Sequence, residues 1–430
     1  MSNMKDLKET SAETPAAKSE GKPEGKGDGH GGGSKGGAGQ KYLIPGNHVW
    51  AGMWKLFAAL AIVGAGMTFA GGAFNDLKRF SYSYLVAFAW GLTLALGGLF
   101  FVLVQHITSA GWSVTVRRVA EQLAGTIPVF VVLFIPIMLL RKTLYASWMG
   151  PNVSHVVHAK HGYLNETFWI VRAIVFFAIW LFLSGKLLQH SREQDESRAP
   201  SLTNKMRALS APGILLFALS ITFSGIDWYM TLAPAWFSTM FGVYIFAGAI
   251  ISMFSFMNLI FTRMNASGLL TTEVNVNHFH DLGKFQFGFT VFWAYIAFSQ
   301  YMLIWYANIP EETEFFLHRQ THDWDKVGYA LVLVHFFVPF FLMLSRHAKR
   351  WAGPRSLAAA VILVMHWVDL YWLIMPNHDE HFHLNALADL GPWFFVMGVM
   401  FAFFFKNLAG APIIPVGDPR LDRALHHQNA

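Results

Sequence analysis

The segment VILVMHWVDLYWLIM, Val361 to Met375, is apolar or aromatic at every position except His366 and Asp369. It belongs to an apolar run that begins near residue 357, and about 20 such residues cross the hydrocarbon core of a bilayer. An ionised Asp at the centre of a membrane helix costs about 2.5–3.5 kcal/mol on insertion scales. The segment therefore predicts a membrane helix with two polar residues on nearly one face, which serve either proton chemistry or a structural hydrogen bond.

The composition of the whole chain also indicates a membrane protein. Its 430 residues are 54% hydrophobic and 13% charged, whereas soluble domains carry about 25% charged residues. The sequence contains no Cys, which excludes disulfides, Cys-ligated iron–sulfur clusters and covalently attached c-type haem. The net charge of +6 comes largely from Lys near the N-terminus and from interhelical loops, a distribution that orients a membrane protein and does not indicate nucleic-acid binding.

Apolar runs of membrane-spanning length recur along the chain. The expected helices cover residues 53–72, 83–105, 119–140, 167–189, 208–230, 238–261, 286–306, 327–345, 357–375 and 391–406. The predicted fold class is an all-α polytopic membrane protein with about ten transmembrane helices. We expect a disordered Gly- and Lys-rich tail over 1–41, the helical domain over 42–410 and a C-terminal tail over 411–430.

The distribution of Lys and Arg predicts the orientation of these helices. One set of loops, which includes Arg117, Arg263 and Lys349, carries about twice as many basic residues as the opposite set. By the positive-inside rule the richer set faces the cytoplasm. Both termini are then cytoplasmic, and the tails at either end of the chain lie on that side.

Polar side chains at membrane depth are the candidate functional residues. The expected proton-transfer residues, all in the middle or outer half of the later helices, are Asp227, His335, His366 and Asp369. The expected hydrogen-bonding relays between them are Ser220, Ser224, Tyr295, Ser299 and Gln300. The alternative is structural, because Ser hydroxyls often bond to backbone carbonyls and a buried Gln or His often cross-links helices. Pro339 follows His335 by four residues and predicts a kink with a freed carbonyl nearby.

Charged residues at the helix ends complete the candidates. A cytoplasmic entrance for protons, or alternatively an interfacial turn, is formed by His278, His280, Asp281 and Lys284, with Tyr244 and Ser255 deeper in the membrane. Arg172 is expected to snorkel to the interface or to pair with Glu166. The external segment NHDEHFH over 377–383 lacks the H-E-x-x-H pattern, so we predict contact with a partner protein and no metal site.

Three classes of membrane protein remain compatible with these residues. A subunit of a quinone-linked redox complex needs a His or Asp as proton acceptor, because quinol oxidation releases protons together with electrons. A haem b carrier would use His335 and His366 as axial ligands from neighbouring helices. A secondary transporter would have an internal repeat with paired broken helices, and neither is clear in the sequence.

Three segments resemble a known family. They are TFSGIDWYMTLAPAWFSTMFGVY (Thr222 to Tyr244), VNVNHFHDLGKFQFGFTVFWAYIAFSQYMLIWYANIPEET (Val274 to Thr313) and HWVDLYW (His366 to Trp372). They resemble the ActF-type membrane subunit of bacterial alternative complex III, a quinol:cytochrome c oxidoreductase of the respiratory chain. That subunit is similar to the NrfD and polysulfide-reductase membrane anchors. The resemblance covers about residues 42–415.

The resemblance implies a fold, a location and partners. The fold would be two four-helix bundles with two flanking helices, in the inner membrane of a bacterium. The partners would be an iron–sulfur subunit, c-type haem subunits and a second, NrfD-like membrane subunit. The chain would then belong to an enzyme without holding a redox centre, and would contribute a transmembrane proton path. Whether quinol or menaquinol also binds this chain stays open, because quinol binding in the family is associated more securely with the sister subunit.

Overall fold

The computed structural model describes residues 41–73, 75–151 and 153–429. The tail predicted over 1–41 lies outside the described residues, apart from Lys41. Within the described residues, nine helices are long and apolar enough to cross a membrane. Two more helices, Val114–Leu133 and Ile135–Leu144, pass the same test together as one span that is bent by 55°. The chain is a polytopic all-α membrane protein, which confirms the predicted fold class.

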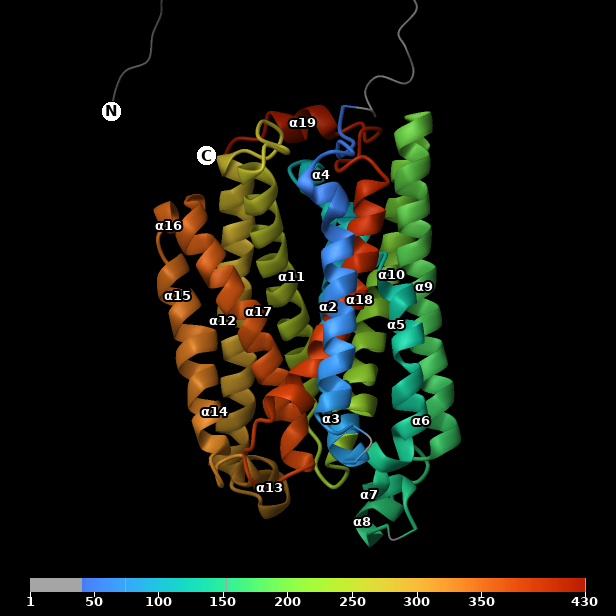
Figure 1. Cartoon of the computed structure of the whole chain (residues 1–430), viewed down its shortest axis with the longest axis vertical. Coiled ribbons are helices and arrows are strands. Elements are labelled where there is room, and N and C mark those ends of the chain that lie inside the picture. The colour runs from blue at the N-terminus through green and yellow to red at the C-terminus, as the bar shows by residue number, and fades with distance from the viewer. Residues whose placement is uncertain (1–40, 74, 152, 430) are drawn as a thin grey trace, which may run out of the picture. The chain divides into compact units, whose positions relative to one another are not determined.

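The spans run side by side, and short helices join them at their ends (Figure 1). The uninterrupted spans are α2 (Val49–Ala70), α3 (Leu77–Ile107), α9 (Glu166–Ser197), α10 (Pro200–Trp228), α11 (Phe241–Ala266), α12 (Val276–Ala307), α17 (Ala352–Ile374) and α18 (Ala386–Ala409). The interrupted spans consist of α4 (Val114–Ala124), α5 (Ile127–Leu133) and α6 (Ile135–Leu144), and of α14 (Trp324–Ala330), a π-helical segment (Leu331–Phe337) and α15 (Val338–Met343). The short helices are α7 (Ala146–Met149), α8 (His155–His158), α13 (Pro310–His318), α16 (Arg346–Arg350) and α19 (Leu421–Leu425).

The spans form two groups of four. In the first bundle α3, α4–α6, α9 and α10 contact one another, and in the second bundle α11, α12, α14–α15 and α17 do so. The two bundles meet chiefly where α11 and α17 pack on α3 and where α10 packs on α11. The first and last spans, α2 and α18, pair with each other and pack on α3 through α18. This is the arrangement of two four-helix bundles and two flanking helices that the resemblance implies.

Glycines allow α2 and α18 to approach closely. A Cβ atom on Gly398 would lie 2.7 Å from the Cα atom of Ala61, and one on Gly64 would overlap the backbone of Phe395. Small residues of this kind let membrane helices bring their backbones into contact. The two outermost spans of the sequence therefore form one tight pair.

Proline accounts for the two interrupted spans. The third span, expected as one helix over 119–140, bends at Phe134, where Pro136 has no N–H to bond to the carbonyl of Val132. In the eighth span the π-helical segment lies directly before Pro339. Where the sequence predicted a kink with a freed carbonyl, the structure has this π-helical segment, and it contains His335.

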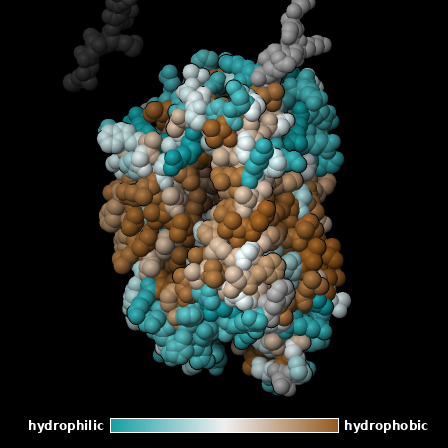
Figure 2. Space-filling model, in the orientation of Figure 1, coloured by the Kyte–Doolittle hydropathy of each residue, from teal (hydrophilic) through white to brown (hydrophobic). Residues whose placement is uncertain are grey.

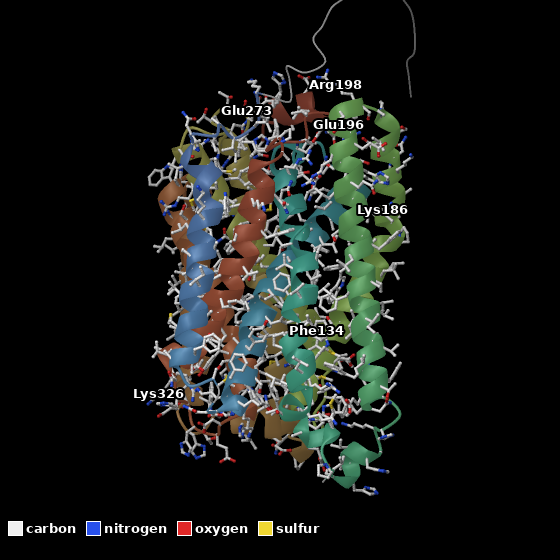
Figure 3. All side chains as sticks on the ribbon, turned by 45° about the vertical axis from the view of Figure 1, so that its right-hand side comes forward. Phe134, Lys186, Glu196, Arg198, Glu273 and Lys326 are labelled. Atoms are coloured by element: carbon white, nitrogen blue, oxygen red, sulfur yellow. The ribbon has the colours of Figure 1, made fainter. Side chains whose placement is uncertain are left out.

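The surface divides into three zones. Hydrophobic side chains form a band across the middle of the visible face, and hydrophilic ones cover both ends (Figure 2). We name the ends after their helices: the α19 end, and the α13 end, which also carries α7 and α8 (Figure 1). Glu196 and Arg198 lie at the α19 end, and Lys326 lies at the α13 end (Figure 3).

The C-terminal residues pack on the α19 end. Ile413 donates its backbone N–H to the carbonyl of Tyr42 at 2.9 Å, and Ile414 is buried. Asp418 forms ion pairs with Arg117 of α4 and with Arg420, each at 2.8 Å. The residues expected as a tail from 411 onward therefore cover one end of the helical domain up to Asn429.

Candidate functional site

Asp369 is buried on α17 and held by side chains of two other helices. Tyr244 of α11 donates a hydrogen bond to Oδ1, and Nε1 of Trp293 on α12 donates to Oδ2 at 3.1 Å. No ion pair to this carboxylate occurs within the part of the chain that the structure describes. Burial favours a protonated carboxyl group, whereas the two donors favour the carboxylate. The surroundings of Asp369 therefore contain features that stabilise its protonated form and features that stabilise its ionised form.

His366 lies on the same helix and joins the site to the first bundle. Its Nε2 atom is 2.9 Å from the hydroxyl of Thr93 on α3. Its Nδ1 atom is buried without a hydrogen-bond partner among the described residues. On α11, a Cβ atom at Gly248 would lie 2.9 Å from the imidazole Cε1 atom. The absence of a side chain at this position makes room for the ring.

His335 packs against the same tryptophan that binds Asp369. Its ring stacks on Trp293 with centroids 4.1 Å apart and planes inclined by 24°. The side chain is 0% exposed, and both ring nitrogens lack a partner within residues 41–73, 75–151 and 153–429. His335 also lies within electrostatic range of His366. Asp369 and His335 thus both contact Trp293, which the sequence did not indicate, and His366 lies one turn from Asp369 on α17. We name these four residues the Trp293 cluster.

A line of buried polar side chains leads from this cluster toward the α19 end. Those on α11 are Ser252, Ser255 and Asn258, and those on α12 are Thr290, Gln286 and Asp281. Asn258 donates from Nδ2 to Oε1 of Gln286 at 2.7 Å, and the other polar atom of each amide has no partner in the described chain. The Ser and Thr hydroxyls donate to carbonyls of their own helices, so their lone pairs remain able to accept from water.

The four residues of the predicted entrance lie together at the start of α12. His278 contacts the N-cap residue Asn275 through Nδ1 at 3.0 Å, in a capping box. Asp281 pairs with Lys284 at 2.6 Å and also contacts Nε2 of His427 at 2.6 Å. His280 lies near this pair, so the polar line has a charged group at its α19 end.

Asp227, the fourth predicted residue, belongs to a separate cluster in the first bundle. Its carboxylate accepts from Nε of Arg172 at 2.6 Å and from the hydroxyl of Tyr163 at 2.7 Å. The pairing of Arg172 with Glu166 was therefore wrong, and Glu166 instead binds Arg141. Burial, with the adjacent carboxylate of Asp227, raises the pKa of Tyr163, which keeps its hydroxyl a donor. The structure thus places Asp227 in an ion pair, away from the residues around Trp293.

The predicted relay residues do not form one route. Ser220 accepts from Nε1 of Trp180 at 2.8 Å, and Ser224 donates to a carbonyl of its own helix, both in the first bundle. Gln300 accepts from Ser238 at 3.0 Å, and Ser299 donates to the carbonyl of Ile296. Tyr295 is 64% exposed, because the helical period of α12 turns it outward between Trp293 and Ile296, which are buried. Tyr295 lies on the outer surface, so the prediction that it relays protons between the buried residues was wrong.

Arg319 binds backbone carbonyls near the C-terminal end of α17. These carbonyls lie about one helical turn after Asp369 in the sequence. Its guanidinium donates to the carbonyls of Trp372 at 3.2 Å and Leu373 at 2.8 Å, and it lies 3.5 Å from the ring centroid of Phe315. Burial lowers the pKa of Arg319 to about 9, so the group is still charged at neutral pH. A buried cation thus stands at the α13 end of the bundle.

The first bundle contains an ion network that sequence analysis treated as loop charges. Glu121 accepts from Arg117 at 2.8 Å and from Ser191 at 2.8 Å, and pairs with Arg118 at 3.0 Å. Arg118 also binds Asp195 of α9. The spacings of four between Arg117 and Glu121 and of three between Arg118 and Glu121 are the sequence patterns that could have indicated it.

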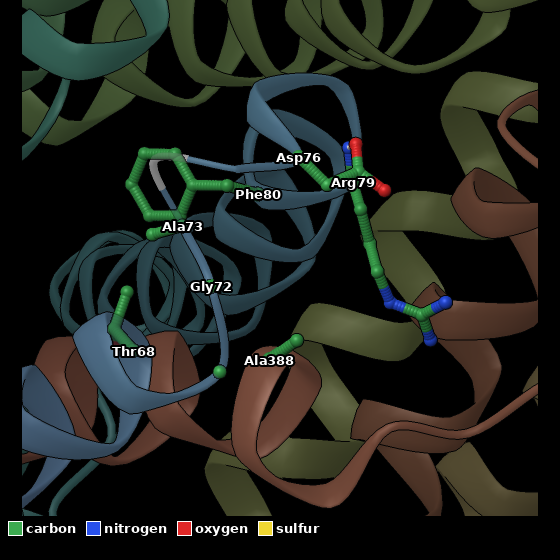
Figure 4. A pocket seen from close by; sticks show the side chains of 8 residues that line it. Thr68, Gly72, Ala73, Asp76, Arg79, Phe80 and Ala388 are labelled. Carbon is green, nitrogen blue, oxygen red and sulfur yellow. The ribbon is translucent and has the colours of Figure 1, made fainter.

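Two cavities lie near the α13 end. The one in Figure 4 has a volume of about 10 Å³ and is lined by Thr68, Asp76, Arg79 and Phe80 among others, so it has room for one water molecule at most. The other has a volume of about 240 Å³, and Tyr163, Trp236 and Phe237 help to line it. Neither is lined by residues of the Trp293 cluster.

Comparison with known proteins assigns no family to the chain, because no family model matches it and no curated protein matches it.

Proposed function

We propose that the chain is a membrane subunit of a quinol:cytochrome c oxidoreductase of the alternative complex III type, in which it carries protons through the membrane. The observation that carries the proposal is the buried cluster of His335, His366 and Asp369 around Trp293, with a carboxylate that has hydrogen-bond donors and no ion-pair partner in the described chain. The resemblance of three long segments to the ActF-type subunit supplies the class of complex.

Protons would enter by the polar line between α11 and α12. Asp281 would take up a proton at the α19 end, and the Asn258–Gln286 pair with its two free polar atoms would pass it inward through bridging water. His366 would accept it at Nδ1, which has no hydrogen-bond partner among the described residues, and Asp369 would hold it next. The hydroxyl of Tyr244, bonded to Asp369, would then pass a proton on toward the α13 end.

The haem b alternative keeps ring nitrogens that could serve as axial ligands. Nε2 of His366 contacts the hydroxyl of Thr93, so His366 would have to bind iron through Nδ1 or leave Thr93. Both ring nitrogens of His335 lack a hydrogen-bond partner in the described chain. A haem b carrier is therefore the second candidate function.

The proposal includes location and partners. The α19 end, which collects more basic residues, would face the cytoplasm of a bacterium, with the chain in the inner membrane. Quinol or menaquinol would supply electrons to haems and iron–sulfur clusters in the partner subunits, and a second NrfD-like subunit would adjoin this one. The segment over 377–383, in which Glu380, His381 and His383 are exposed, would contact an external partner.

The test is the substitution Asp369→Asn in the whole complex, reconstituted in vesicles. Asn keeps the shape of the side chain but cannot exchange a proton. We expect protons translocated per quinol oxidised to fall, because the central proton-holding group is lost. Tyr295→Phe, on the outer surface, is the matched control. Unchanged proton translocation and quinol oxidation in the Asp369→Asn complex would refute the proposal.

A further inference from the structure

The C-terminal segment brings a histidine onto the entrance residues. Nε2 of His427 lies 2.6 Å from Oδ2 of Asp281, and the other oxygen of that carboxylate binds Lys284 at 2.6 Å. The His427 side chain is 19% exposed, and that of Asp281 is 9% exposed. His427 is therefore better placed than Asp281 to exchange with solvent at this end.

Several contacts fix the position of this histidine. Its carbonyl oxygen accepts from the side-chain amides of Asn275 at 3.2 Å and Asn277 at 3.3 Å. Asn429 donates to the carbonyl of Asn277 at 3.1 Å. The ring lies 5.2 Å from that of His278, which is itself fully buried. The start of α12 thus binds the C-terminal segment through its backbone as well as through the imidazole.

The same segment is anchored on the first bundle. Asp418 is bound by Arg117 of α4, and the backbone N–H of Gly417 donates to Asp195 of α9 at 3.2 Å. Ala424 of α19 is buried. The segment therefore crosses from one bundle to the other and ends on the polar line between α11 and α12.

We propose that His427 is the proton-collecting residue of the entrance, held there by a C-terminal segment that closes the α19 end. This inference rests on the proposed function and adds a residue to it. A proton from water binds one ring nitrogen as the proton on Nε2 passes to the carboxylate of Asp281. After Asp281 has delivered this proton inward, water removes the proton from the other ring nitrogen and returns one to Nε2, which restores the starting tautomer of His427 with one proton moved from solvent to the interior. The step moves protons only, with no redox change.

Imidazole rescue separates this role from a structural one. The variants are His427→Ala, which removes the collector, and His427→Gln, whose amide can still bond to Asp281 and keep the segment in place. The control is His426→Ala, because the neighbouring His426 side chain is 78% exposed and its polar contact within the described residues is with Asp422 of α19. All are measured in the reconstituted complex as the rate of proton uptake at the α19 end.

We expect His427→Ala and His427→Gln to slow proton uptake by a factor on the order of 10², the usual size of a general acid–base contribution. Added imidazole should restore the rate in His427→Ala, and His426→Ala should behave as the parent. If proton uptake is normal in both His427 variants but slow in Asp369→Asn, the role of His427 is overturned and the proposed function stands. A loss in His427→Ala that imidazole does not rescue, with normal uptake in His427→Gln, would also overturn it. Normal uptake in Asp369→Asn would remove the proposed function and this inference together.

Discussion

At the scale of single residues, two buried carboxylates have opposite environments. Asp227 is neutralised by the guanidinium of Arg172, whereas Asp369 is held by the hydroxyl of Tyr244 and the indole of Trp293. A fully buried carboxylate paired with a guanidinium, which does not lose its proton, stays ionised and serves as a fixed charge. One held only by neutral donors can change its protonation state at a smaller cost. Asp369 is therefore the better candidate for proton transfer.

The ion pair of Asp227 predicts a stability effect. Asp227→Asn leaves the guanidinium of Arg172 buried without its counter-charge, which should destabilise the protein by about 3–5 kcal/mol. The matched control is Glu166→Gln, which breaks the partly exposed pair with Arg141 and should cost about 0.2–1 kcal/mol. Thermal unfolding in detergent measures both. Equal effects of the two substitutions would show that Asp227 and Arg172 are not paired as described.

The contact of Gly248 with His366 predicts a second effect. In Gly248→Ala the new Cβ would lie 2.9 Å from the imidazole, so the ring must move away from Thr93. We expect a loss of about 1–3 kcal/mol, as for other overpacked cores, together with slower proton translocation. Gly288→Ala on α12 is the control, because its Cβ would meet nothing within 4 Å. If both alanines leave stability and transport unchanged, His366 is not confined by α11.

Part of the candidate site could be predicted from the sequence. The spacing of three between His366 and Asp369 could be read directly as one helix face. Trp293 was one aromatic among 16 Trp residues and 40 Phe residues, and nothing local distinguishes it. The partners of Asp227 and Asp369 lie 55 and 125 positions away, so only the packing of helices brings them together.

At the scale of helices, length and hydropathy predicted the spans but not their irregularities. Pro339 indicated a disturbed helix, and the π-helical segment lies directly before it. The bend at Phe134 was missed, although Pro136 lies inside the expected helix, because proline is common in membrane helices that stay straight. The docking of the C-terminal segment was also missed, since it depends on ion pairs between residues about 300 positions apart, such as Arg117 and Asp418.

Asp418 predicts how this docking responds to pH. Burial alone would raise the pKa of Asp418, but the hydrogen bonds from Arg420 and the charge of Arg117 outweigh it and hold the pKa below its usual value. A lowered pKa gives stabilisation that is complete above the ordinary value of about 3.9 and is lost as the pH falls through the pKa of the folded state. We therefore expect the contribution of Asp418 to docking to be constant from about pH 5 to pH 8.

Amide hydrogen exchange of residues 421–429 measures this docking. Asp418→Asn should increase exchange of residues 421–429 at each pH between about 5 and 8, because both ion pairs of Asp418 are lost. Asp422→Asn is the control, since that carboxylate is 91% exposed. If the difference in protection between the parent chain and Asp418→Asn, compared at the same pH, shrinks between about pH 8 and pH 5, the role given to Asp418 is contradicted.

At the scale of the whole molecule, Lys and Arg are divided unequally between the loops at the two ends. The sequence predicted this division from the basic residues of alternate loops, because charge distribution is a property of the chain that needs no knowledge of packing. How the two bundles meet could not be predicted, since the apolar faces of α3, α11 and α17 look alike in sequence. The grouping into bundles came only from the resemblance.

The absence of Cys allows a direct test of orientation. Single cysteines can be introduced as Glu196→Cys at the α19 end and Lys326→Cys at the α13 end, both exposed (Figure 3). In intact cells a membrane-impermeant thiol reagent should label Lys326→Cys, and Glu196→Cys should react only after the membrane is opened. Labelling in the reverse order would invert the proposed direction of proton flow.

The central claim is that Asp369 changes its protonation state while the complex turns over. Redox-difference infrared spectroscopy of the whole complex measures this directly through the stretching band of a protonated carboxyl group. The account predicts a difference band in that region that is lost in Asp369→Asn and retained in Asp227→Asn, provided that the latter assembles. A band that persists in Asp369→Asn, or one that is absent from the parent complex, would contradict it.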